Sequence, residues 1–181
     1  MNVGSYYAYP MGLKEGTKIV KLNHGQETNV PIEYLQKDDL IKTGNGYKAI
    51  AAIGKIVVHH SGNKERTKEN LYQLTKKNYP TLFEDLIVSG CESILVDSIT
   101  QTQRNKIVEN SSSIIFFDNK YGLHAYADEK AIPHEKAGTY TMYQIALMNI
   151  GDKNSGCYAN GLLVSTASVH WLQHISKMTA L

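Results

Sequence analysis

The sequence predicts a single, mostly β domain with two or three short helices. Its 181 residues suffice for one domain, and an all-β unit of this length can bury an adequate core without metals or disulfides. Short runs of β-branched and aromatic residues alternate with Gly, Asn and Pro, which is the pattern of strands joined by tight turns. Only small stretches carry a helical period, so few helices are expected.

The first sixty residues are predicted to form hairpins. Pro31 opens one helical turn over 31–35, because a proline loses no hydrogen bond at the first helical position. The glycines of 44–46 lie between two strands with no helix after them, so they predict a tight turn rather than a phosphate loop. Gly54 predicts a bulge in a long ribbon. The strands expected in this part are 17–22, 40–43 and 47–60, with a turn at 23–25.

The rest of the chain alternates predicted strands with short helices. A helix is expected over 70–77, ending before Pro80, and a second over 99–109. A last helix over 169–178 would place Trp171, Leu172, Ile175 and Met178 on one apolar face. The strands expected are the two apolar runs within Leu82–Asp97, then 114–117, 121–127, 139–148 and 157–166, with a charged loop over 128–138.

Composition excludes several classes of function. A net charge of +2, with lysines spread along the chain, does not favour nucleic acid binding. No window approaches 18 uninterrupted apolar residues, so no membrane span is expected. No apolar signal region follows Met1, which predicts an intracellular protein with free thiols at Cys91 and Cys157. No cofactor is expected.

Tyrosine is unusually frequent, with 12 tyrosines against three phenylalanines and one tryptophan. Tyrosine suits half-buried surfaces, where the ring packs and the hydroxyl stays hydrated. Residues 1–11 carry three of these tyrosines and no clear period, so they are expected to form an arm that contacts a protein partner.

Four stretches together resemble the Hedgehog/intein (Hint) domain superfamily. They are Gly12–Ile19, Pro31–Thr43, Ser89-Gly90-Cys91-Glu92 in place of a Thr-x-x-His motif, and Tyr158–Val164 as a closing strand. The residues of Leu82–Asp97 and Tyr158–Val164 are similar to those of Hint-like proteins of large DNA viruses, in a degenerate form. The resemblance implies a pseudo-twofold horseshoe of long curved β-hairpins. It divides the chain into an N-terminal arm (1–11), a Hint-like β domain (12–166) and a C-terminal helix packed on that domain (167–181).

The resemblance also implies which positions would carry chemistry. The first residue of such a domain attacks the carbonyl before it, and that position is Gly12, which has no side chain. The motif histidine that protonates the departing amide is replaced by Glu92, with Ser89 at the threonine position. The terminal His-Asn pair falls on Ser165 and Thr166, and a hydroxyl cannot form the imide that asparagine forms. We therefore expect no intact catalytic site.

Two groups of the sequence could stand in for the lost ones. Cys91 is a thiol beside the Glu92 carboxylate, but the carboxylate would raise the pKa of the thiol, and a buried structural cysteine is the stronger interpretation. His170 and His174, four residues apart on the predicted last helix, could share a zinc ion, although a solvated helix face is the stronger interpretation. His59 and His60 are neighbours on a strand and face opposite sides, so they cannot share a metal.

Two functions follow from these patterns. The first is a catalytically inactive Hint-fold protein that acts as a structural or protein-binding component, such as a minor virion or capsid protein of a large DNA virus. It would contact other subunits through the arm and the C-terminal helix. The alternative is an autoprocessing domain that cleaves the peptide bond before residue 12 and has been inactivated by engineering or naturally.

Overall fold

The computed structural model describes residues 12–110, 113–148 and 154–181, and the fold is mostly β, as predicted. The expected N-terminal arm lies outside the described residues. Four helical elements are described: α1 (Gln101–Glu109), the 3-10 turns η1 (Ile32–Tyr34) and η2 (Ala125–Ala127), and the π-helical turn η3 (Trp171–Ile175). The described strands are β1 (Leu13–Lys14), β2 (Lys18–Asn23), β3 (Gln26–Pro31), β4 (Leu40–Thr43), β5 (Gly46–His60), β6 (Leu71–Leu74), β7 (Leu86–Ser89), β8 (Ser93–Val96), β9 (Phe116–Phe117), β10 (Lys120–His124), β11 (Ile132–Pro133), β12 (Gly138–Leu147), β13 (Cys157–Ala159), β14 (Leu162–Val164) and β15 (Thr179–Ala180).

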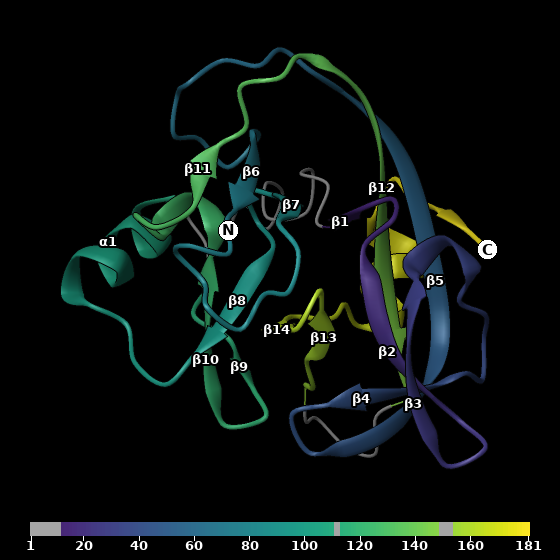
Figure 1. Cartoon of the computed structure of the whole chain (residues 1–181). Coiled ribbons are helices and arrows are strands. Elements are labelled where there is room, and N and C mark those ends of the chain that lie inside the picture. The colour runs from purple at the N-terminus through teal and green to yellow at the C-terminus, as the bar shows by residue number, and fades with distance from the viewer. Residues whose placement is uncertain (1–11, 111–112, 149–153) are drawn as a thin grey trace.

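Two long antiparallel strands, β5 and β12, form the spine of the molecule. They pair from His60 opposite Gly138 to Ile50 opposite Leu147. Figure 1 shows β6, β8, β10, β11 and α1 on one side and β2 to β5 with β12 and β13 on the other. The connections from β5 to β6 and from β11 to β12 arch over the top between the two groups. Antiparallel pairing runs without a break from β11 through the spine to β9.

The main core lies between these strand groups. It includes Leu13, Ile19, Ile41, Val88 and Ile145, each with almost no exposed surface. A second, smaller cluster forms where the C-terminal segment packs on the spine, and it consists of Ala52, Ala146, Ala167, Trp171, Leu172 and Met178. Burial of these two apolar faces is the main stabilising contribution that the fold provides.

The helix predicted over 70–77 is wrong, because residues Leu71–Leu74 form strand β6. This strand pairs with β7 and β11, and Leu71, Tyr72 and Leu74 are buried. Strand pairing and burial outweigh the weak helical preference of the sequence. The predicted charged loop over 128–138 likewise contains the short strand β11, the partner of β6.

The predicted C-terminal helix is shorter than expected, and the predicted bulge lies elsewhere. Residues 169–170 are α-helical and Trp171–Ile175 form η3, and the chain then extends into β15, which pairs with β5. The register of β5 slips between Ile50 and Ala52, so the bulge is near Ala51 and not at Gly54. A Cβ on Gly54 would lie 2.7 Å from Leu172 Cδ1, so this glycine instead lets the C-terminal segment approach the spine.

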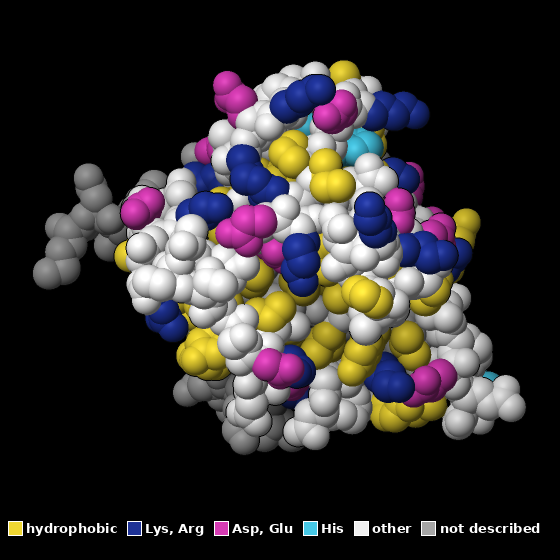
Figure 2. Space-filling model, turned by 60° about the vertical axis from the view of Figure 1, so that its left-hand side comes forward, with side chains coloured by type: hydrophobic (Ala, Val, Ile, Leu, Met, Phe, Trp, Pro, Cys, Tyr) yellow, Lys and Arg dark blue, Asp and Glu magenta, His cyan; other side chains and the backbone are white. Residues whose placement is uncertain are grey.

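Other predicted elements are confirmed. The helical turn after Pro31 is η1, and the helix expected over 99–109 is α1. A capping box begins α1, in which Thr100 Oγ1 accepts from the Gln103 N–H and the Gln103 side chain accepts from the Thr100 N–H. Figure 2 shows one face of the molecule, on which positive and negative side chains are interleaved between patches of apolar ones.

Candidate functional site

Strands β1 and β7 place Gly12 and Ser89 against each other. The Gly12 N–H donates to Ser89 Oγ at 2.8 Å, and the Ser89 N–H donates to the Gly12 carbonyl at 3.0 Å. Ser89 is buried. The amide of Gly12 belongs to the peptide bond before residue 12, so the Ser89 hydroxyl contacts the bond that the family resemblance singles out.

No side chain fits at position 12 with the present backbone. A Cβ there would lie 2.7 Å from the carbonyl oxygen of Tyr143 and 3.3 Å from Met178 Cε. The nearer atom belongs to the backbone of β12, which is held on both sides by β1 and β5, so it cannot move away as a flexible side chain could. A glycine is therefore required here by close approach.

Glu92 is a fully buried carboxylate at the end of the turn that follows β7. Oε1 accepts a hydrogen bond from the Ser165 hydroxyl, and Oε2 accepts from Gln144 Nε2 at 2.8 Å. Burial raises the pKa of Glu92 to about 7, and the hydrogen bonds from Ser165 and Gln144 limit the rise. The group is thus poised between its neutral and charged forms near neutral pH.

The closing strand brings Ser165 to this carboxylate but takes Thr166 elsewhere. Ser165 Oγ accepts from the Ser93 N–H at 3.2 Å, and the Ser165 N–H donates to the Ser93 carbonyl at 2.9 Å. The Thr166 hydroxyl donates to the Ser155 carbonyl at 2.6 Å. The Glu92 N–H donates to the Ser89 carbonyl, so the turn over residues 89–92 connects the Gly12–Ser89 pair to the Glu92–Ser165 pair. The structure therefore gathers Gly12, Ser89, Glu92 and Ser165, and it places Thr166 in a separate bond.

Sequence reasoning missed two residues of the site. Gln144 is 1% exposed, and its Oε1 accepts from the Ile145 N–H while its Nε2 donates to Glu92. An amide inside the apolar run 139–148 is the signal that could have identified it. His124 ends β10, where its Nδ1 lies 2.9 Å from the Cys91 carbonyl, and burial lowers the pKa of His124. A neutral His124 then donates from Nδ1 to that carbonyl.

Cys91 is a buried structural cysteine. Its Sγ contacts the Lys68 carbonyl at 3.8 Å, and burial, more than the Glu92 charge, raises its pKa to about 12. Burial also raises the pKa of Cys157. Both thiols are free, as predicted, and both stay protonated at neutral pH.

The other histidines do not assemble a metal site. His59 is exposed beside Thr139, whereas His60 is buried, with Nε2 2.5 Å from the His134 carbonyl, so the two neighbours face opposite sides as expected. The rings of His170 and His174 lie 5.0 Å apart. Within the described residues, no three His, Cys, Asp or Glu side chains cluster as metal ligands would, and no helix is long and apolar enough to cross a membrane.

Two solved structures are similar to this chain, whereas the sequence comparisons found no match. No family model and no curated protein matches the sequence. Among solved structures the chain is similar to the gp41-1 intein, with a TM-score of 0.40 and 13% identity over 87% of this chain and 99% of that one. It is also similar to a substituted form of the same intein, with a TM-score of 0.42 and 12% identity over 87% and 100% of the two chains.

Proposed function

We propose that this chain is a catalytically inactive Hint-fold protein that serves as a structural or protein-binding component. The observation that carries the proposal is the packing at Gly12. The position at which the resemblance requires a nucleophile has no side chain, and a Cβ there would lie 2.7 Å from the Tyr143 carbonyl oxygen. Because residue 12 itself has no nucleophilic side chain, the N-to-S or N-to-O acyl shift at the peptide bond before it cannot take place.

The bonding of Glu92 supports the same proposal. A proton donor for a departing amide must be free to reach that nitrogen. Here the two carboxylate oxygens are engaged by Gln144 and Ser165, and the Gly12 N–H is engaged by Ser89. Because these groups are already hydrogen-bonded to one another, we expect them to stabilise the core and not to take part in a reaction.

Autoprocessing is the second candidate, and one observation favours it. The pKa of Glu92 is about 7, which would allow this group to give up a proton at neutral pH. It would act on the bond before Gly12, whose N–H already bonds to Ser89 Oγ.

Intact-mass measurement of the full chain separates the two candidates. The protein is incubated at pH 6, 7 and 8 with dithiothreitol or hydroxylamine, beside a Glu92→Gln variant. The inactive role predicts an unchanged mass throughout. Loss of residues 1–11 from the parent chain but not from the variant would establish autoprocessing, while a cut present in both would come from a contaminating protease.

The partners we propose are other protein subunits, in the setting of a large DNA virus particle that the resemblance implies. Residues 1–11 are one proposed contact. In the C-terminal segment Trp171 and Leu172 are buried on the spine, whereas Gln173 and Lys177 are exposed. A partner at this segment would therefore meet its polar side.

A further inference from the structure

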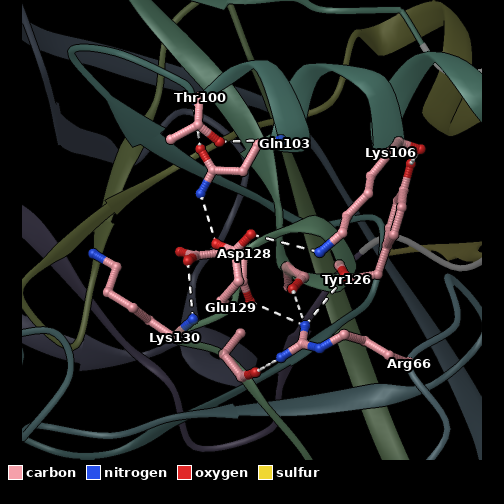
Figure 3. Close-up of polar contacts among 10 residues, drawn as sticks. Arg66, Thr100, Gln103, Lys106, Tyr126, Asp128, Glu129 and Lys130 are labelled. Atoms are coloured by element: carbon pink, nitrogen blue, oxygen red, sulfur yellow. Dashed lines mark hydrogen bonds and ion pairs between the residues drawn. The ribbon is translucent and has the colours of Figure 1, made fainter.

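Four backbone carbonyls converge on the guanidinium group of Arg66. Nη1 donates to the carbonyl oxygens of Ala125 at 3.4 Å, Tyr126 at 3.1 Å and Asp128 at 3.0 Å, and Nη2 donates to that of Ala131. Figure 3 shows the guanidinium group at the centre of these bonds. We call this set of carbonyls the carbonyl cradle.

The shape of the carbonyl cradle is fixed by groups other than Arg66. The Asp128 carboxylate accepts from the Tyr79 hydroxyl at 2.8 Å and from the Lys130 N–H at 3.1 Å. The Ala131 N–H donates to the Asp128 carbonyl at 3.1 Å, which closes the turn after η2. Asp128 is fully buried. The carbonyls should therefore keep their directions when the arginine is removed.

A neighbouring anchor holds the cradle against α1. Gln103 Nε2 donates to Glu129 Oε2 at 3.0 Å, and Lys106 Nζ lies 3.5 Å from Glu129 Oε1 (Figure 3). The segment that forms the cradle is thus held from the helix side as well as by Tyr79.

An aromatic ring completes the site. The central carbon of the guanidinium group lies 5.4 Å from the centroid of the Tyr72 ring, and Tyr72 is fully buried with its hydroxyl donating to the Thr67 carbonyl at 2.7 Å. A flat cation with a π face on one side and several donors at its edges matches this arrangement, whereas a compact ammonium ion does not.

The Arg66 side chain enters the site from the surface of the molecule. Arg66 belongs to the connection between β5 and β6, which has no helix or strand over residues 61–70. Residues 63–66 are exposed, so solvent reaches the outer side of the site. A ligand could enter along the path that the Arg66 side chain now fills.

We propose that the carbonyl cradle and the Tyr72 ring form a guanidinium-binding site, which the chain fills with its own Arg66 and in which an arginine of a protein partner can replace it. The proposal deepens the protein-binding role by naming the ligand chemistry, and it rests on that role. The guanidinium-binding site is tested by thermal rescue and the inactive role by intact mass. Either proposal can therefore fail while the other stands.

Chemical rescue tests the site. In the full-length Arg66→Ala variant, ~10 mM methylguanidinium should raise the melting temperature by on the order of 1–4 °C over the same concentration of methylurea or methylammonium. N-acetyl-arginine amide should act as methylguanidinium does, and N-acetyl-lysine amide should not. The parent chain, whose site is filled, should show no such difference.

The matched control is Arg104→Ala, which removes the other arginine of the sequence from α1 and leaves the cradle filled. Equal effects of methylguanidinium and methylurea on Arg66→Ala, or equal rescue of the two variants, would overturn the proposal. If Arg66→Ala does not fold, Arg66→Lys keeps the charge and the aliphatic stem, and the same selective rescue is required of it. Rescue by methylguanidinium but not by the arginine amide would overturn the claim for a protein partner.

Discussion

Replacing Glu92 by Gln should remove a large part of the pH dependence of stability between pH 5 and 8. Burial raises the pKa of Glu92 from 4.5 to about 7, so the folded state binds this proton more tightly than the unfolded state. The resulting stabilisation is fully present below pH ~4.5 and is lost as the pH rises through 7. A rise of about 2.5 pH units at 1.36 kcal/mol per unit corresponds to about 3 kcal/mol.

Gln keeps the volume of Glu and one acceptor oxygen but cannot ionise. Glu92→Gln should therefore match the parent near pH 5, within about 1 kcal/mol for one altered hydrogen bond, and exceed its stability at pH 8 by about 2 kcal/mol. Urea unfolding at pH 5, 6, 7 and 8 measures the difference between the two proteins. Groups common to both, such as His124 and His134, cancel in that difference.

The matched control is Glu84→Gln, whose carboxylate is 51% exposed and pairs with Lys18 at 2.6 Å. Because an exposed ion pair contributes little, this variant should follow the parent curve at every pH. Parallel curves for the parent and Glu92→Gln would show that burial does not raise the Glu92 pKa, and the reasoning would fail.

Three further predictions follow from close packing and burial. Gly12→Ala should lower the free energy of unfolding by about 1–3 kcal/mol in urea, because of the backbone contact at 2.7 Å. Gly138→Ala, where the nearest atom is 3.6 Å away, is the control, and equal losses would refute the steric argument. Gly54→Ala should detach the C-terminal segment and shift the fluorescence of Trp171, the single tryptophan, to the red; an unchanged spectrum would contradict that packing. The Cys91 thiol should resist Ellman's reagent at pH 8 until the protein unfolds, and rapid reaction in the folded state would show that it is accessible and ionised.

Local patterns predicted most of the elements that are confirmed. The apolar runs of β2, β4 and β5, the turns between them and the helix α1 depend mainly on neighbouring residues, so they can be predicted from the local sequence. The prediction for 70–77 failed for the opposite reason. Leu71–Leu74 form a strand because β7 and β11 supply hydrogen bonds from distant parts of the chain.

The site was predictable in position but not in its bonding. The motif put Ser89 and Glu92 in one four-residue stretch and Ser165 directly after the closing strand, and the structure brings all three close to one another. The part played by Gln144 was not predicted, since one amide in an apolar strand does not reveal its acceptor. The separate bond of Thr166 to the Ser155 carbonyl also depends on where the closing strand ends.

The sequence by itself determined the mostly β class, the hairpins and the absence of a nucleophilic side chain at Gly12, because these are properties of residue type and spacing. The tertiary structure alone decided which residues meet. Gly12 bonds to Ser89 across 77 positions, and Glu92 bonds to Ser165 across 73. Such contacts follow from the pairing of strands far apart in the chain, which also brings the Tyr143 carbonyl close enough to leave room only for a glycine.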